Sequence, residues 1–444
     1  MILFILGIGI SCIWLYAFNP AITSTDPQGL YTQAMEVGTP GFTMRDWQPP
    51  MYVFIIAGLQ KIWDDITFMV ILQMIFFWLV MVDAILYFYK MGAPKWILGL
   101  AYLYMAFGYS NQIQLVTFWK DISFGTALVW LTLLLVKVIK DPGPYTKKWY
   151  FYIELFTALF FVAFLRQNGI LAVGALIILL PLFFRKRGYI IVSILMFMTL
   201  VIVKGPIYKA NNIIPQPSLK YFAMTNDLLK LYFEGYDLDD ETIRLCERVI
   251  DAEAYRENVT YSTYWNDYFH ADLSDVTVPR FIRLYIRNLI KHPKAVIRAF
   301  LERTQIIWSV TKNDAEITSC IHYVEEMNTI EPESYPHRID NLLTGILTNM
   351  VLSLKQNKTI YIFFWRPGIY NLFIILSTMI LLIDLRKRGM AVLFPAIPIV
   401  LNVFALFVSS GWSDYRYHWP SVLVSWIIVS YALLINEETI LKTS

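Results

Sequence analysis

Charged side chains that could act on a substrate are concentrated in a few short segments, each beside a long apolar stretch. These segments carry Asp26 and Asp46, Lys120-Asp121, Arg166-Gln167-Asn168, and Asp414-Tyr415-Arg416-Tyr417. A carboxylate can accept the proton of an attacking hydroxyl group, and Lys or Arg can stabilise the growing charge of a phosphate leaving group. Ionisable groups near the membrane interior are costly and are therefore functional candidates, with ordinary water-facing loop charges as the alternative.

The elements that must position these residues are apolar and long. Only 16% of the 444 residues are charged and 57% are hydrophobic, whereas a soluble domain is typically about 25% charged. Since roughly 17–25 apolar residues cross a bilayer, the sequence predicts an all-α polytopic membrane protein with about ten spans. The predicted spans are Ile2–Phe18, Ile66–Val82, Trp96–Gly108, Ile122–Ile139, Trp149–Leu165, Gln167–Phe184, Gly188–Val203, Pro367–Ile383, Gly389–Ser413 and Tyr417–Ile435.

Basic residues between these stretches indicate how the chain crosses the membrane. They occur at Lys90 and Lys95, in Lys137–Lys148, in Arg185–Arg187 and in Arg386–Arg388. All can be cytoplasmic together only if both termini are cytoplasmic and residues 210–357 lie outside. The first stretch could instead be a cleaved signal peptide, but it lacks a basic start and a clear cleavage site. The net charge of +3 is too small to imply nucleic acid.

The spans divide the chain into three blocks: an N-terminal transmembrane module (1–204), an extracytoplasmic and mainly helical domain (205–359), and C-terminal transmembrane helices (360–444). The middle block holds most of the acidic residues. Within it, basic residues recur every three or four positions and so share one helical face: Arg280, Arg283, Arg287, Lys291, Lys294 and Arg298. This basic strip could bind an anionic polymer or lipid headgroups, or it could simply face water. Pro293 must bend or interrupt the helix.

The first outer loop, residues 19–65, is unusually long and contains its own elements. Residues 29–37 could form a short helix, and the Trp47-Gln48-Pro49-Pro50 segment precedes an apolar run near 51–63. That run is too short to span comfortably, so we expect a helix lying in the membrane interface, with Pro at the favoured helix start.

The order of these features resembles the GT-C class of membrane glycosyltransferases, which includes protein mannosyltransferases and the aminoarabinose transferases of lipid A. The resemblance is carried by Thr23–Tyr31, by Gln48-Pro49-Pro50-Met51-Tyr52 and by Asp121. The strings Thr117–Asp121, Leu165–Gly169 and Tyr415–Pro420 are also similar to those of a poorly characterised bacterial family with this layout. The similarity covers the first block and, more weakly, the last three spans.

The resemblance implies an inverting glycosyltransferase of the bacterial cytoplasmic membrane. Its donor would be a polyprenyl-phosphate sugar, and its acceptor an extracytoplasmic molecule such as a cell-envelope glycan or polymer. Asp26 occupies the position of the family's catalytic base, and Asp121 that of its second acidic residue. The expected substrate-binding residues are Asp46, Lys120, Arg166, Asn168, Arg416 and Tyr417. Asp121 could also hold a divalent metal, Mg²⁺ or Mn²⁺, through oxygen ligands, and no other cofactor is implied.

Two other functions are compatible with the sequence. A lipid-linked-sugar flippase or transporter predicts charges inside spans and broken helices in paired repeats, whereas Asp83 and Glu154 are the main charges near spans and no repeat is visible. A polysaccharide polymerase or ligase would share the late outer segment, but the long first outer loop argues against it. The three cysteines form no disulfide framework, although Cys246 and Cys320 could pair.

Overall fold

The computed structural model describes residues 1–23, 25–140, 142–216, 221–249, 273, 276–311, 341–383, 389–410 and 414–443. These residues form helices almost throughout, and the strands among them are limited to one short parallel pair. The all-α prediction is therefore confirmed. The predicted basic segment Arg386–Arg388 and Cys320 lie outside the described residues.

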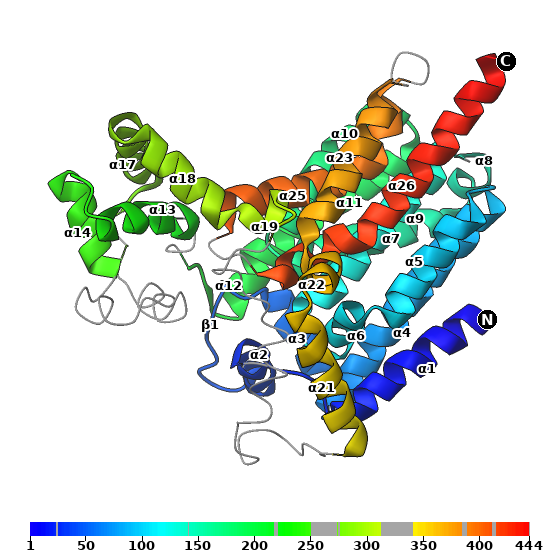
Figure 1. The fold of residues 1–444 in the computed structure, drawn as a ribbon, viewed down its shortest axis with the longest axis horizontal. Coiled ribbons are helices and arrows are strands. Elements are labelled where there is room, and N and C mark those ends of the chain that lie inside the picture. Colours follow the sequence, from blue (N-terminus) through cyan, green and yellow to red (C-terminus); the bar gives the residue numbers. More distant parts are fainter. Residues whose placement is uncertain are drawn as a thin grey trace.

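The N-terminal half forms most of the bundle (Figure 1). Its elements are α1 (Ile2–Ala17), α2 (Thr25–Glu36), β1 (Met44–Arg45), α3 (Pro50–Gln60), α4 (Ile66–Lys90), α5 (Lys95–Phe107), α6 (Tyr109–Val116), α7 (Lys120–Lys140), α8 (Pro142–Thr146), α9 (Trp149–Leu165), α10 (Gly169–Phe184), α11 (Arg187–Ile202), a π-helical turn η1 (Val203–Ile207), α12 (Tyr208–Ala210) and β2 (Ile213–Ile214).

The remaining elements form a small domain beside the bundle, named the outer domain for its position outside the bundle, and then return to the bundle. The outer domain contains α13 (Phe222–Phe233), α14 (Asp240–Val249), α17 (Val278–Lys291) and α18 (Pro293–Arg303), followed by α19 (Gln305–Trp308). The returning elements are α21 (Leu342–Gln356), α22 (Lys358–Trp365), α23 (Pro367–Ile383), the 3-10 helix η4 (Met390–Ala396), α25 (Ile397–Ser409) and α26 (Tyr415–Thr443).

The structure contains a helix at each of the ten predicted spans, but not all are long enough to cross a membrane alone. By length and composition, five helical segments of the described chain qualify, or six if the bent pair α22–α23 is one span. The other four, α1, α5, α9 and α10, contain only 13 to 17 residues. These helices support a multi-pass membrane protein. The predicted 51–63 helix is present as α3, with Pro50 in its first turn.

The bundle is organised around α7 and α26, which are the most deeply buried of the long apolar helices. Helix α7 packs against α4, α9 and α26, and α26 also packs against α23. Close contact between the two central helices depends on Gly125, because a Cβ there would lie 3.1 Å from the ring of Trp419. Helix α11 is mostly exposed and apolar, as expected for a lipid-facing helix.

The structure subdivides the predicted middle block. The helices α13, α14, α17 and α18 enclose two small apolar cores of their own. By contrast, α21 belongs to the bundle: Val351 lies in the main core, and Asn341 Nδ2 donates to the carbonyl of Tyr16 over 3.1 Å. Residues 341–359 thus pack against the transmembrane helices because α21 presents an apolar face to α1.

Residues 109–116 lie between two of the predicted spans, and they form the fully buried helix α6. Buried polar groups need hydrogen-bond partners. Here two side-chain amides of α6 donate to backbone carbonyls at the C-terminal end of α5. Asn111 Nδ2 donates to the carbonyl of Tyr104 at 3.0 Å, and Gln112 Nε2 donates to those of Met105 and Ala106 at 2.9 Å. The string of polar residues therefore caps a neighbouring helix instead of facing water.

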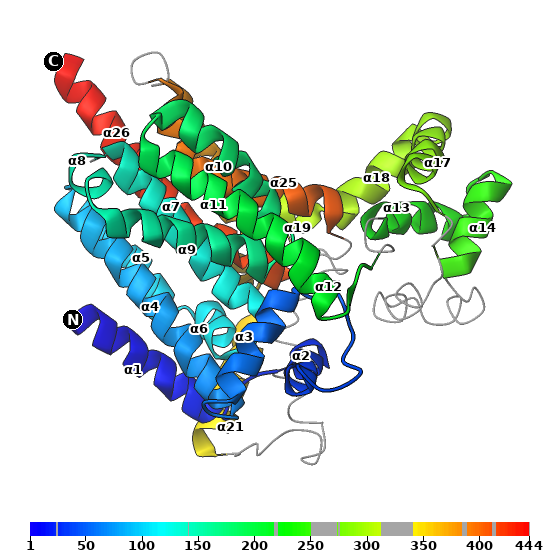
Figure 2. The same ribbon diagram turned by 180° about the vertical axis from the view of Figure 1, so that it is seen from behind.

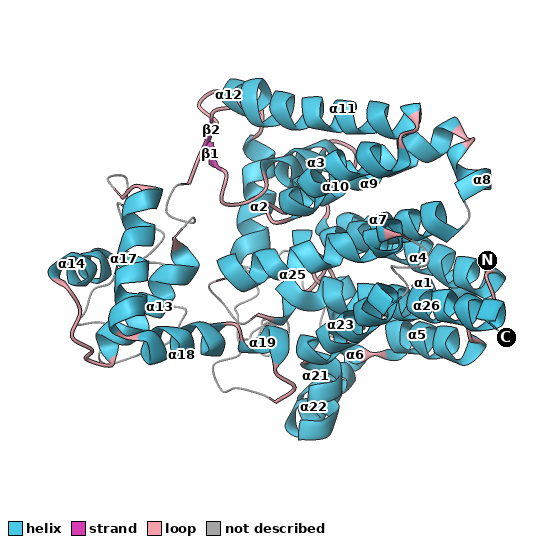
Figure 3. Cartoon of the chain, turned by 90° about the horizontal axis from the view of Figure 1, so that it is seen from above, coloured by secondary structure: helices cyan, strands magenta, loops and turns pink. Residues whose placement is uncertain are grey.

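Both chain termini lie at one end of the bundle, and α2, α12, the strand pair and the outer domain lie at the other (Figures 1 and 2). The view from above shows the outer domain extending beyond the ends of the bundle helices (Figure 3). The segments that carry the predicted site residues are at this second end.

Candidate functional site

A short backbone bridge brings the first outer loop to the start of α7. The Ile22 amide donates to the carbonyl of Val116 at 3.0 Å, and the Phe118 amide donates to the carbonyl of Ile22 at 2.9 Å. Asp26 comes four residues after Ile22, and Lys120 comes two residues after Phe118. The bridge therefore places the start of α2 beside the start of α7.

The first part of the site is an ion pair between Arg166 and Asp121. Arg166 ends α9, and Asp121 lies in the first turn of α7, where the helix dipole favours a carboxylate. Asp121 is fully buried, and its second carboxylate oxygen, Oδ2, has no hydrogen-bond partner in the part of the chain that the structure describes. A buried acceptor of this kind is costly unless a ligand or water satisfies it.

The second part is Arg416 at the start of α26. Its Nε lies 2.9 Å from Asp414 Oδ2, and its Nη2 lies 3.5 Å from Asp26 Oδ2. The guanidinium group also lies 4.4 Å from the centre of the Trp119 ring. These contacts fix the orientation of Arg416 on three sides, which is a form of preorganisation.

Tyr417 joins the two ion-paired parts. Its ring centre is 4.5 Å from the Arg166 guanidinium and 4.8 Å from that of Arg416, so both cations use the negative face of one ring. Its hydroxyl group also accepts a hydrogen bond of 2.9 Å from Arg416 Nη2. Tyr417 therefore holds two like charges close together.

Lys120 differs from the two arginines because its ammonium group contacts a neutral amide. Lys120 Nζ donates to Gln48 Oε1, and no ion pair of Lys120 is found among the described residues. Gln48 is buried, and no described residue forms a hydrogen bond with its Nε2. Burial, with a smaller contribution from Asp121, raises the pKa of nearby Tyr52 on α3, so this phenol remains a neutral donor.

The charges of the cluster are unevenly paired. Three cations, Lys120, Arg166 and Arg416, face three carboxylates, Asp26, Asp121 and Asp414. The two guanidinium groups form ion pairs with these carboxylates, whereas the ammonium group of Lys120 is available to bind an anionic ligand. Asp26 is the most exposed carboxylate, at 29%, compared with 1% for Asp121 and 6% for Asp414.

Two of the predicted site residues make contacts outside this cluster. The Asp46 backbone amide donates to the carbonyl of Ile214 at 2.9 Å, and its Oδ1 accepts from the Gln216 amide at 2.7 Å. Asn168 Nδ2 donates to Asn402 Oδ1 at 2.7 Å. Asp46 thus ties the first outer loop to the segment after β2, and Asn168 ties α10 to α25.

Gln48, Trp119 and Asp414 also contact the cluster but are not among the predicted site residues. Each is adjacent to a predicted residue or motif, since Gln48 precedes the two prolines and Trp119 precedes Lys120. Buried Arg366, at the break between α22 and α23, was also missed; its Nη2 donates to the carbonyl of Ser309 at 3.2 Å. A lone arginine beside a proline gave no signal in the sequence.

The expectation of a metal at Asp121 can be compared with the described part of the chain. There, no three His, Cys, Asp or Glu side chains are close enough to form a metal-binding group. His418, next to Tyr417 in the chain, is fully buried, and neither of its ring nitrogens has a hydrogen-bond partner among the described residues. Asp121, the expected metal ligand, is engaged by Arg166.

The basic strip is largely neutralised by the acidic residues of the outer domain. The ion pairs are Arg280–Glu241, Arg287–Asp239, Lys291–Asp237 and Arg298–Glu234. As Pro293 predicted, the strip is broken at His292 into α17 and α18. Such exposed pairs contribute little stability each, but they leave few free cations for a polymer.

No protein-family model matches this chain, and no curated protein and no solved structure shows significant similarity to it. Its function is therefore inferred from the side-chain contacts and from the sequence resemblance.

Proposed function

We propose that this chain is an inverting, GT-C-like glycosyltransferase that moves a sugar from a polyprenyl-phosphate donor to an extracytoplasmic acceptor, such as an envelope glycan or polymer. The observation that supports this proposal is the meeting of Asp26, Lys120, Asp121, Arg166 and Arg416 from four separate segments. An ordinary set of loop charges would have no reason to converge around one partly buried tyrosine, Tyr417, and one ammonium group, Lys120, that makes no ion pair among the described residues.

The proposal includes the topology. The ten apolar helices, including the four short ones, would cross a bacterial cytoplasmic membrane with both termini inside. The cluster would then lie at the outer surface, because it is at the end of the bundle opposite the termini. A donor whose prenyl chain stays among the lipids could present its phosphate at that level.

In the proposed reaction, the donor phosphate binds Lys120, and Arg166 and Arg416 face its other oxygens. The acceptor hydroxyl attacks the anomeric carbon and forms the new C–O bond. Its proton passes to the Asp26 carboxylate, while the bond to the phosphate oxygen breaks and polyprenyl phosphate leaves with the electron pair. Asp26 suits this role because it is accessible and has only a long contact to Arg416. Asp121 positions Arg166.

A lipid-linked-sugar flippase or transporter remains the second candidate, since one span is broken. Helices α22 and α23 meet at an angle of 53°, and broken helices are typical of transporter binding sites. A polymerase or ligase would use the same anionic donor chemistry and is distinguished by its product.

The test is sugar transfer by the purified full chain in nanodiscs, with labelled polyprenyl-phosphate sugars and envelope extract. Asp26→Asn should abolish both sugar transfer and the slow hydrolysis of the donor. Glu36→Gln, an exposed change on the same helix, should abolish neither. Full activity of Asp26→Asn would reject Asp26 as the base. Donor movement between leaflets of proteoliposomes without any turnover would reject the enzyme and favour the flippase.

A further inference from the structure

The outer domain carries an apolar stripe that none of its own helices covers. Along α17, Val278, Ile282, Ile286 and Ile290 repeat every four residues, which places them along one side of the helix. Each is between 43% and 76% exposed. The opposite side of α17, with Phe281 and Leu284, forms the core with α13 and α14.

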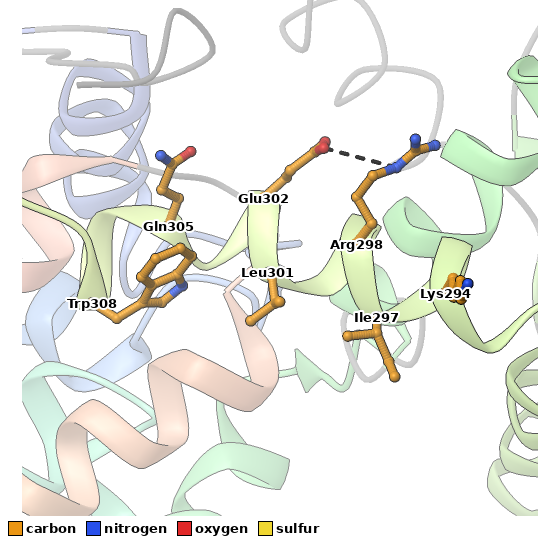
Figure 4. A pocket seen from close by; sticks show the side chains of 7 residues that line it. All are labelled: Lys294, Ile297, Arg298, Leu301, Glu302, Gln305 and Trp308. Atoms are coloured by element: carbon orange, nitrogen blue, oxygen red, sulfur yellow. Dashed lines mark ion pairs between the residues drawn. The ribbon is translucent and has the colours of Figure 1, made fainter. Parts of the chain in front are cut away.

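The stripe continues on α18 and α19. Ile297, Leu301 and Trp308 are between 41% and 51% exposed, and they line a shallow depression of about 450 Å³. Figure 4 shows these three side chains projecting from one side of the helix, with Arg298, Glu302 and Gln305 on the other. Exposed apolar side chains are thus found on each of the three successive helices α17, α18 and α19.

At its lower end the stripe meets the surface of the transmembrane bundle. Ile306 and Ile307 of α19 belong to the main bundle core, and the ring of Phe300 is 4.8 Å from that of Phe407 on α25. Helix α25 itself exposes Phe404 and Val408. One apolar surface thus continues from a membrane helix onto the outer domain.

The charges beside the stripe suit lipid headgroups. Within the described residues, Arg283 and Lys294 make no ion pair, unlike the other members of the basic strip. An amphipathic helix with aliphatic residues on one side and basic residues at its edge is the usual form of an interfacial membrane segment. Trp308 has the amphipathic ring found at the headgroup level.

We propose that the stripe formed by α17, α18 and α19 lies in the outer leaflet of the membrane, with Arg283 and Lys294 at the lipid phosphates. The outer domain then lies against the bilayer beside α25 and does not project freely into water. This inference requires a membrane-embedded bundle but does not depend on the glycosyltransferase proposal.

The experiment places a fluorescent NBD label on the stripe of the full chain in nanodiscs. Ile286→Cys and the more exposed Ile290→Cys are made with Cys12→Ser and Cys320→Ser, while buried Cys246 is retained. Glu247→Cys, exposed on α14, is the matched control. Each sample is quenched either by lipid carrying a nitroxide near the glycerol or by iodide in water.

We expect the nitroxide lipid to quench labels at 286 and 290 severalfold more than the label at 247, and iodide to show the reverse order. Strong iodide quenching at both stripe positions, with no effect of the lipid, would overturn the proposal. Protection from both quenchers would also overturn it, because another protein surface would then cover the stripe.

Discussion

The contrast between Asp26 and Asp121 gives the sharpest prediction from the cluster. Both are acidic residues in the first turn of a helix, and the sequence resemblance assigns catalytic roles to both. Their environments differ, however, because Asp26 is 29% exposed and 3.5 Å from its cation, whereas Asp121 is 1% exposed and paired directly with Arg166. Replacing each by Asn should therefore affect different properties.

The magnitudes follow from these environments. A partly exposed ion pair contributes about 0–1 kcal/mol, so Asp26→Asn should hardly change the free energy of unfolding. Loss of a catalytic base should slow turnover roughly 10²–10⁴-fold, which corresponds to about 3–5 kcal/mol in the activation barrier. Asp121→Asn leaves the Arg166 charge without its carboxylate in a buried site, which should cost about 3–5 kcal/mol of stability.

The assay combines single-turnover donor cleavage with thermal unfolding of each variant in the same nanodiscs. We expect Asp26→Asn to unfold near the wild-type temperature and to be nearly inactive. Asp121→Asn should unfold at a clearly lower temperature, and Arg166→Gln should lower it similarly. If Asp26→Asn is destabilised as much as Asp121→Asn while turning over normally, the assignment of base and positioning roles is wrong.

Three further predictions concern single positions. Lys120→Met should lower kcat/KM for the donor about 10- to 100-fold, since a hydrogen bond to a charged group contributes about 1.5–3 kcal/mol, and Gln48→Leu should have a smaller effect in the same assay. Gly125→Val should cost about 1–3 kcal/mol by overpacking against Trp419, which lower thermal stability would report. Burial raises the pKa of the Cys246 thiol to about 12, so maleimide should label it at pH 8 only when the outer domain unfolds; rapid labelling of the folded chain would contradict that burial.

The sequence predicted the helices of the bundle because an apolar stretch leaves the backbone no alternative in lipid. It also predicted the break at Pro293 and the short helix after Pro50, since proline restricts the backbone locally. It did not predict α6, because the polar string at Asn111 and Gln112 resembles an outer loop. Its burial is explained by the last carbonyls of α5, which accept hydrogen bonds from the side-chain amides of Asn111 and Gln112, a contact that composition does not reveal.

The sequence could identify the residues of the candidate site, but not the ion pairs that they form. Asp26, Lys120, Arg166 and Arg416 stand out because each is a charge beside an apolar helix. Which cation binds which carboxylate depends on helix packing, so the sequence could not show that Asp121 forms an ion pair with Arg166. The contacts of Asp46 and Asn168 were also not predictable from the sequence. Both lie near predicted site residues in the chain, but each connects segments outside the cluster.

The outer domain is connected to the cluster through one buried arginine. Arg303 at the end of α18 forms a two-point contact with Asp227, at 2.8 and 3.1 Å, and also donates to the carbonyl of Ser410. Ser410 follows α25 and lies only a few residues before Asp414 and Arg416. A shift of α18 would therefore move the backbone at the end of α25, which precedes the Arg416 site in the sequence. If α17 to α19 lie on the lipid surface, the bilayer itself sets the position of that backbone relative to the donor phosphate.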